Sequence, residues 1–183
     1  MTYTEKTVHQ ERLYEGRILN LRRDDILLPD GKPSRREVVE HSGGVSVLAV
    51  EDGKVLLVRQ FRYPYGEELW EIPAGKREPG EDPESCGRRE LEEETGRTAD
   101  QFTLLATLYP TPAYCTEVIY VYLAQGLHKT RQKLDPGEFL SVEEMPFDQA
   151  LSLVLEGKIP DAKTQIALLK YDLLARRGLV GKE

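Results

Sequence analysis

The sequence predicts an α+β protein, in which helices pack on a mixed sheet and an extension of antiparallel strands comes first. Short apolar runs separated by turn residues recur along the chain, and three segments carry helix start or stop residues. A chain of 183 residues can form one domain with a substantial core but is short for two. We therefore predict a strand extension at residues 1–40 and one main domain at residues 41–183.

Composition and charge narrow the class of protein. Hydrophobic residues make up 39% and charged residues 31% of the chain, as in soluble globular proteins. Because the chain has neither an apolar run of membrane-spanning length nor the apolar centre of a secretory signal, we expect a cytoplasmic protein without membrane contact. A net charge of −7 argues against a nucleic-acid partner, which requires a basic face. Cys86 and Cys115 show neither metal-ligand spacing nor a disulfide framework.

Strand signals come first along the chain. Residues Tyr14–Val39 indicate two or three strands, with a turn at Pro29-Asp30-Gly31. The apolar runs Gly44–Val50 and Val55–Arg62 indicate a second hairpin around the turn dipeptide Asp52-Gly53. We expect these two apolar runs to be core strands.

The clearest helix is predicted at Pro83–Thr95. Asp82 has the side chain of an N-cap, Pro83 suits the first helical position, and Gly96 is a C-terminal stop. Two strands are expected after this helix and two helices at the end of the chain, at residues 101–109, 118–127, 147–156 and 162–177. Asp161 is the expected N-cap of the last helix.

Acidic residues on the predicted central helix indicate its chemistry. Glu90 and Glu94 are four residues apart and Glu93 lies between them, so that all three carboxylates share one helix edge. Such like charges repel, and a divalent cation compensates them, because Mg²⁺ prefers carboxylate oxygens and shares its coordination shell with phosphates. The alternative is an ordinary solvated acidic face. Arg89 can pair with Glu93 and orient this edge.

A glycine-containing loop precedes the helix and favours the metal site. Trp70–Ala74 has the pattern of an apolar strand end, and Gly75 follows it. Such a loop can bring backbone carbonyl groups toward the same cations. The position of this loop just before the acidic helix therefore favours a metal site over a solvated acidic face.

The whole pattern resembles the signature of the Nudix hydrolase family. That signature is Gly, five residues, Glu, seven residues, Arg-Glu, an aliphatic residue, any residue, Glu-Glu, any residue, Gly and a final aliphatic residue. Gly75, Glu81 and the segment Arg89–Gly96 match every fixed position. Arg97 departs from the final aliphatic position, which concerns the packing at the helix exit.

The resemblance implies a Nudix-type α/β/α sandwich that hydrolyses a nucleoside diphosphate linked to another group, with Mg²⁺ as cofactor and Mn²⁺ as a substitute. It makes Glu90 and Glu94 metal ligands and Glu93 a further ligand or the support of one. It also makes Ala74 a ligand through its backbone carbonyl, and the other charged positions of the signature structural. Cations so held polarise phosphate oxygens and lower the pKa of a bound water.

A second resemblance concerns the substrate. ADP-ribose pyrophosphatases of this superfamily carry a proline about sixteen residues beyond the signature glycine and a catalytic glutamate about five residues later. Pro112 and Glu117 match, whereas Ala113 stands in place of a glycine. Glu117 is therefore the predicted general base or positioner of the attacking water, and Glu93 is its rival. Without the resemblance, this loop is equally well an ordinary proline-stiffened connection.

The subfamily resemblance also implies a homodimer with shared active sites, in which the N-terminal strands exchange between subunits. Arg36 and Glu37 would approach the adenosine end of the substrate across the dimer, and Arg62 would bind a phosphate or the terminal ribose. His41 is a further candidate for substrate contact. By itself, Arg36 is more often a strand-edge charge and His41 more often a strand-end polar residue.

The predicted function is Mg²⁺-dependent hydrolysis of the pyrophosphate bond of ADP-ribose, which yields AMP and ribose 5-phosphate. Two alternatives stay open. The same acidic edge would serve another nucleoside diphosphate sugar or a dinucleotide, such as a GDP-hexose. A sensor that binds ADP-ribose without turnover belongs to a different class of protein; the complete carboxylate set argues against it, and nothing from Gly126 onward offers a basic recognition helix.

Overall fold

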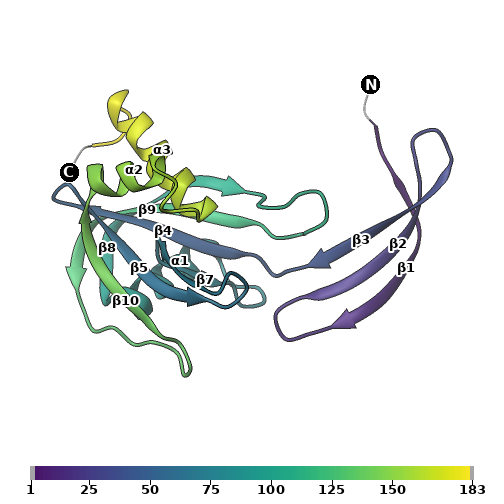
Figure 1. Ribbon diagram of the computed structural model, residues 1–183, viewed down its shortest axis with the longest axis horizontal. Coiled ribbons are helices and arrows are strands. Elements are labelled where there is room, and N and C mark those ends of the chain that lie inside the picture. Colours follow the sequence, from purple (N-terminus) through teal and green to yellow (C-terminus); the bar gives the residue numbers. More distant parts are fainter. Residues whose placement is uncertain (1–2, 182–183) are drawn as a thin grey trace. The chain divides into compact units, whose positions relative to one another are not determined.

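The computed structural model describes residues 3–181, which form two compact units (Figure 1). One unit contains the chain up to Gly43 together with Tyr109–Val118, and the other contains Gly44–Leu108 and the chain from Ile119 onward. The predicted boundary of the strand extension at residue 40 stays a prediction.

The first unit is a three-stranded antiparallel sheet in the order β1-β2-β3, with β1 at Lys6–Glu15, β2 at Asn20–Leu27 and β3 at Pro33–Glu40. The strands predicted within residues 14–39 are confirmed, but β1 begins much earlier than the sequence indicated. Every side chain of β1 is exposed, so its sequence shows no apolar alternation that would reveal a strand. The loop at residues 109–118 joins this unit through backbone hydrogen bonds to Val39.

The second unit contains a seven-stranded sheet and three helices. Its main path runs β10-β5-β4-β9-β8, with β6 paired to β5 and β7 paired to β4. Only the pairing of β4 with β9 is parallel among the described strands, so the sheet is mixed, as predicted. The bounds are β4 Gly44–Glu51, β5 Lys54–Arg62, β6 Glu67–Glu71, β7 Ala74–Lys76, α1 Pro83–Thr95, β8 Arg97–Leu108, β9 Ile119–Lys129, β10 Leu140–Pro146, α2 Phe147–Leu155 and α3 Ala162–Arg176.

Alternate side chains of β4 pack into two different layers of this unit. Leu48 and Val50 pack in the core cluster that contains Ala150 of α2 and Leu168 of α3. Val47 and Ala49 pack with Leu91 of α1 in a second cluster. Because successive strand residues face opposite sides of a sheet, α1 covers one face while α2 and α3 cover the other (Figure 1). The predicted α/β/α sandwich is confirmed.

The helix ends lie where their capping residues indicate. Asp82 accepts a hydrogen bond from the backbone N–H of Ser85 at 3.0 Å, and Gly96 ends α1 with φ of 62°. Asp161 caps α3 by accepting from the backbone N–H of Thr164 at 2.9 Å. The strand β10 was not predicted, because its sequence carries polar residues and only Met145 is buried.

No helix in residues 3–181 is long and apolar enough to cross a membrane. Both cysteines are free, as predicted. Cys86 lies in the first half of α1 and is fully buried, and burial raises the pKa of its thiol to about 12. It therefore packs as a small apolar residue and is not a nucleophile at neutral pH.

Candidate active site

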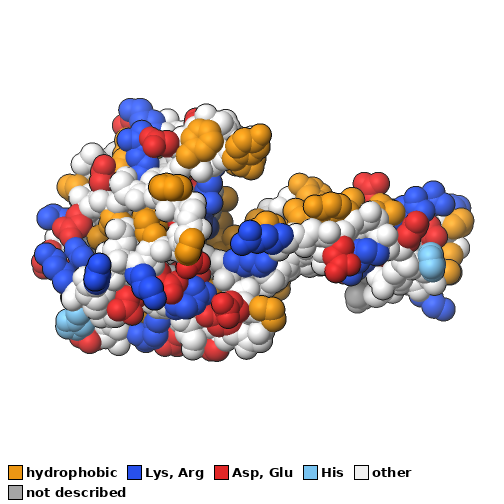
Figure 2. Space-filling view, turned by 90° about the horizontal axis from the view of Figure 1, so that it is seen from below, with side chains coloured by type: hydrophobic (Ala, Val, Ile, Leu, Met, Phe, Trp, Pro, Cys, Tyr) orange, Lys and Arg blue, Asp and Glu red, His pale blue; other side chains and the backbone are white. Residues whose placement is uncertain are grey.

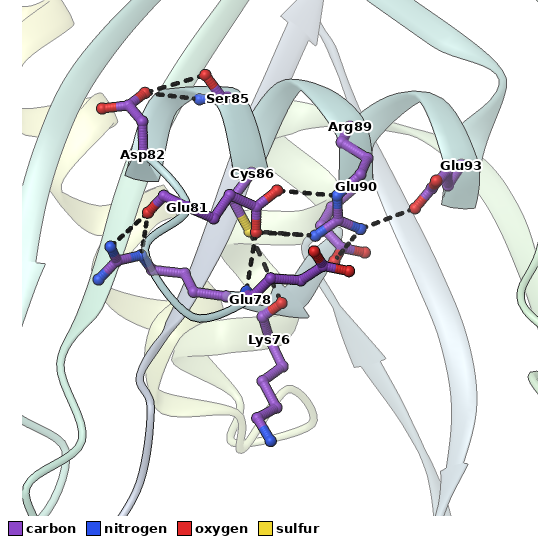
Figure 3. A network of polar contacts seen from close by, with 10 residues as sticks. Lys76, Glu78, Glu81, Asp82, Ser85, Cys86, Arg89, Glu90 and Glu93 are labelled. Carbon is purple, nitrogen blue, oxygen red and sulfur yellow. Dashed lines mark hydrogen bonds and ion pairs between the residues drawn. The ribbon is translucent and has the colours of Figure 1, made fainter.

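Arg89 organises the acidic edge of α1. Its guanidinium donates to Glu81 at 3.0 and 3.2 Å and to Glu93 at 2.9 Å, and it contacts Glu90 at 2.7 Å (Figure 3). The predicted pair with Glu93 is confirmed, and Glu81 reaches the helix from the preceding loop. The hydrogen bond from Arg89 holds the pKa of Glu81 down, to about 2. The guanidinium of Arg89 thus holds three carboxylates in place and connects the loop that carries Glu81 to the helix.

Glu90 and Glu94 are the least exposed carboxylates of this edge: Glu94 is buried and Glu90 is partly buried. The side chain of Glu90 is 12% exposed and Glu94 as a residue is 1% exposed. Burial raises the pKa of Glu94 to about 8, with a further contribution from the charge of Glu90. Burial likewise raises the pKa of Glu90, although Arg89 acts in the opposite direction. Two neighbouring carboxylates that lose water and repel each other are costly unless a cation joins them.

The strand end before α1 contacts both of these carboxylates. The backbone N–H of Ala74 donates to Oε2 of Glu94 at 2.9 Å. A Cβ on Gly75 would lie 1.9 Å from Cδ of Glu90, so a side chain at this position would push the carboxylate away. The glycine therefore allows the Glu90 carboxylate to lie directly against the backbone, at the place where the sequence predicts backbone oxygens near a metal.

These residues have the chemistry of a divalent-cation site. Carboxylates supply hard oxygen ligands, their negative charges are only partly neutralised by Arg89, and the backbone at Ala74 and Gly75 lies against them. In the described part of the chain, no three His, Cys, Asp or Glu side chains are gathered closely enough to hold a metal ion. Glu90 and Glu93 contact Arg89 instead, and Glu94 contacts Ala74. Binding a cation at this edge would therefore require Glu90 to exchange Arg89 for the metal.

A second charged cluster lies in the same unit. Arg62 donates to Glu71 with Nε at 2.5 Å and with Nη2 at 2.6 Å, and Lys163 contacts the same carboxylate. Burial acts to raise the pKa of Glu71, but Arg62 and Lys163 outweigh it and the pKa lies below its usual value. The charge of Glu94 also acts to raise the pKa of Arg62, so the cluster interacts electrostatically with the acidic edge of α1.

Glu138 is a further carboxylate that sequence reasoning missed. It is half-buried in the loop between β9 and β10, where its backbone N–H donates to the carbonyl of Asp135 at 3.0 Å. Its negative charge contributes to the raised pKa of both Glu90 and Glu94. No local signal would have found it, because it follows Asp135-Pro136-Gly137, an ordinary turn sequence.

The other predicted site residues lie in the unit with the N-terminal sheet. Nδ1 of His41 lies 3.3 Å from Oε1 of Glu117, and Oγ1 of Thr116 accepts from the backbone N–H of His41 at 3.0 Å. Arg36 and Glu37 line a groove of about 580 Å³ on this unit. The remaining lining residues are Leu21, Arg23, Arg35, Val39, Ala113 and Tyr114.

The structure therefore brings the predicted residues together in two groups. The first group, in the larger unit, contains the predicted metal ligands and Arg62; the second contains the predicted adenosine-contacting residues and Glu117. Sequence reasoning missed Glu71, Lys163 and Glu138. A usable signal existed for Lys163, because a lysine in the first turn of a helix is opposed by the helix dipole and suggests a specific partner.

Comparison with known proteins agrees with this arrangement. The model of the NUDIX domain matches residues 40–168, and the model of the nucleoside diphosphate sugar hydrolase N-terminal domain matches residues 5–39. The chain belongs to the Nudix family and is a Nudix pyrophosphohydrolase.

Relatives cover most of the chain. An ADP-ribose pyrophosphatase of Bacillus subtilis (strain 168) is 45% identical over 167 residues, 90% of each chain. A methanol dehydrogenase activator of Bacillus methanolicus is 41% identical over 169 residues, 91% of each chain. A GDP-mannose pyrophosphatase of Yersinia pestis (strain Pestoides F) is 36% identical over 148 residues, 74% of this chain and 73% of that one. A crystal structure of an ADP compounds hydrolase shares the fold, with a TM-score of 0.82, 21% identity and coverage of 96% and 97%.

Proposed function

We propose that this chain hydrolyses the pyrophosphate bond of ADP-ribose in a Mg²⁺-dependent reaction and releases AMP and ribose 5-phosphate. The observation that carries the proposal is the pair of neighbouring carboxylates, the buried Glu94 and the partly buried Glu90, with Glu90 lying directly against the backbone at Gly75. The name and the 45% identity of the Bacillus subtilis relative support ADP-ribose as substrate. The family model that matches residues 5–39 supports a nucleoside diphosphate sugar more generally.

Glu90 and Glu94 would hold the cation, with Glu93 and the backbone carbonyl of Ala74 as further ligands. When bound, the cation polarises phosphate oxygens and lowers the pKa of a bound water. Arg89 keeps Glu93 in place and is available to neutralise Glu90 in the metal-free protein. The raised pKa of Glu94 means that its proton leaves on metal binding, so affinity for the metal rises with pH.

A loop carboxylate rather than a metal-binding one accepts the proton of the attacking water, because the metal ligands have their lone pairs committed. Oε1 of Glu117, the residue that the sequence predicts for this role, lies 3.3 Å from Nδ1 of His41, and a histidine at this distance can orient it. Glu138 is the second candidate for this role, because its charge acts on both Glu90 and Glu94 of the acidic edge. Glu93 is the rival on the helix itself.

The groove on the N-terminal sheet is the proposed place for the adenosine end of the substrate. Its walls combine the charged side chains of Arg36 and Glu37 with the apolar and aromatic ones of Val39 and Tyr114, a combination that suits an adenine ring and its ribose hydroxyls. Arg62, with a side chain 38% exposed, is the proposed ligand of a phosphate or of the terminal ribose. His41 would contact the substrate from the end of β3. A homodimer would share these residues between its two sites.

A GDP-hexose is the second candidate substrate, favoured by the relative named GDP-mannose pyrophosphatase. A panel of ADP-ribose, GDP-mannose, NADH and a diadenosine polyphosphate, each with Mg²⁺ or Mn²⁺ and with products identified, separates the two. Release of AMP and ribose 5-phosphate with the highest kcat/KM on ADP-ribose is the expected result. A higher kcat/KM on GDP-mannose would replace the proposed substrate, and tight binding of ADP-ribose without turnover would indicate a sensor.

A further inference from the structure

The first turn of α3 holds the carboxylate to which Arg62 binds. Lys163 lies in this turn, only 12% exposed, and its ammonium group lies between two carboxylates. It contacts Glu71 on one side and Oδ1 of Asp161, at 2.8 Å, on the other. Asp161 is also the N-cap of α3 and caps it through its second oxygen. The helix therefore has its cap without the lysine, and helix stability does not explain a cation at this end.

The same turn also holds the backbone that follows Glu71. Oγ1 of Thr164, which is fully buried, accepts a hydrogen bond from the backbone N–H of Ile72 at 2.9 Å. Ile72 lies two residues before Ala74, whose own N–H donates to Glu94. One turn of helix thus fixes both the side chain of Glu71 and the strand end that leads to the acidic edge of α1.

Glu71 in turn sets the orientation of Arg62. The fork of Nε and Nη2 on a 2% exposed carboxylate fixes the plane of the guanidinium, and Nη1 lies outside the fork. Lys163 neutralises part of the negative charge of Glu71. The positive charge of Arg62 is therefore not fully compensated by that carboxylate, and Arg62 can still attract an anion. Without Lys163, the buried carboxylate would depend on Arg62 alone.

We propose that Lys163 is a positioning residue that holds Glu71, and through it Arg62, in the orientation in which the free edge of Arg62 receives an anionic or hydroxyl group of the substrate. The inference rests on the proposed function, because it takes Arg62 as a substrate ligand. It adds the first turn of α3 to the substrate-binding part of the molecule.

The test compares kcat and KM of the full-length protein carrying Lys163→Met or Lys163→Arg, with Mg²⁺ and ADP-ribose. Lys163→Met keeps the aliphatic chain but loses the charge, and we expect KM to rise by about tenfold while kcat changes much less, as for one weakened charge-assisted hydrogen bond to substrate. Lys163→Arg should restore most of the lost affinity. The matched control is Lys158→Met, because Lys158 is 66% exposed and pairs with Glu156; its KM should equal that of the wild type. The pairing of Lys158 with Glu156 is its only side-chain contact of this kind among residues 3–181.

A double-mutant cycle with Arg62→Lys separates positioning from general destabilisation. If Lys163 acts through Arg62, adding Lys163→Met to Arg62→Lys raises KM by much less than tenfold. Equal effects of Lys163→Met in both backgrounds, or an unchanged KM in Lys163→Met alone, would overturn the inference. Should Lys163→Met fail to fold, Asp161→Asn carries the test, since asparagine keeps the cap but removes the charge that anchors the lysine; a raised KM supports the inference and a wild-type KM overturns it.

The activity of the wild-type protein distinguishes a failure of this inference from a failure of the proposed function. If it does not hydrolyse ADP-ribose, the proposed substrate is wrong, and the same variants are then compared on the substrate of the panel that it does hydrolyse. If it hydrolyses ADP-ribose and the Lys163 variants behave like the Lys158 control, the substrate stands and the role of Lys163 is wrong.

Discussion

At the scale of single residues, folding buries the carboxylate of Glu94 beside other negative charges, an environment that disfavours its ionised form. Glu94 is almost completely buried, close to the negative charges of Glu90 and Glu138. Its pKa of about 8 lies above the ordinary value of 4.5. The folded chain therefore binds more protons than the unfolded chain between these pH values, and metal-free stability falls as pH rises through that window.

We expect Glu94→Gln to abolish most of the Mg²⁺-dependent activity and, without metal, to raise the melting temperature relative to the wild type at pH 8 but not at pH 4. The amide keeps an oxygen for the N–H of Ala74 while removing the charge. Thermal unfolding at the two pH values, with EDTA and with Mg²⁺, measures both effects. Near wild-type turnover of Glu94→Gln would contradict the metal assignment, and Glu92→Gln, on the same helix but outside the buried pair, is the control.

The general base is assigned by comparing Glu117→Gln, Glu138→Gln and Glu93→Gln. We expect one of the two loop variants to lower kcat by roughly a hundredfold or more, with KM much less changed, because general acid–base contributions are of that order. Metal binding should persist in that variant. If Glu93→Gln abolishes turnover with metal binding intact while both loop variants stay active, the base belongs on α1.

At the scale of elements, the exit of α1 shows how backbone conformation holds the acidic edge. Gly96 has φ of 62°, and a Cβ at this position would lie 2.7 Å from the backbone nitrogen of Gln132. The side chain of Gln132 donates to the carbonyl of Glu94, so the loop that packs on the glycine also ends the helix. Arg97, which departs from the family signature, pairs with Glu144 of β10 at 2.9 Å.

We expect Gly96→Ala to lower the free energy of unfolding by more than the roughly 1–2 kcal/mol that an L-residue costs in the left-handed region. The excess arises because a backbone atom, which cannot rotate away, blocks the new methyl group. Gly178→Ala is the matched control: Gly178 follows α3 with φ of 66°, and no atom lies within 4 Å of the place that its new methyl group would take. Equal destabilisation of the two variants by urea unfolding would show that loop packing at Gly96 contributes nothing.

At the scale of the whole molecule, the N-terminal sheet lacks a core of its own. In β1–β3 only Asp24 and Ile26 are buried, and apolar side chains such as Val8 of β1 and Ile18 of the turn after it are more than half exposed. Figure 2 shows hydrophobic side chains along this sheet among charged ones. A three-stranded sheet with an apolar surface gains stability when another surface covers it.

We therefore expect the full chain to sediment as a dimer, and a chain that begins at His41 to be monomeric and to lose affinity for AMP. The shared-site arrangement gives both effects one cause, since the deleted strands would supply the covered sheet and Arg36 and Glu37. Sedimentation velocity and AMP titration measure them separately. A fully active monomeric full chain would refute the shared-site arrangement.

The sequence by itself determined the local elements and the chemical class of the site. The caps Asp82 and Gly96 act within one turn of α1, and the spacing of Glu90, Glu93 and Glu94 follows from helix geometry alone. The tertiary structure alone decided which charges meet. Glu71 and Lys163 are 92 positions apart and come together because β6 and the first turn of α3 pack there; Glu138 approaches α1 from an irregular loop. Such contacts depend on long-range packing, which no local pattern records, whereas a cap or a helix edge depends only on neighbours in the chain.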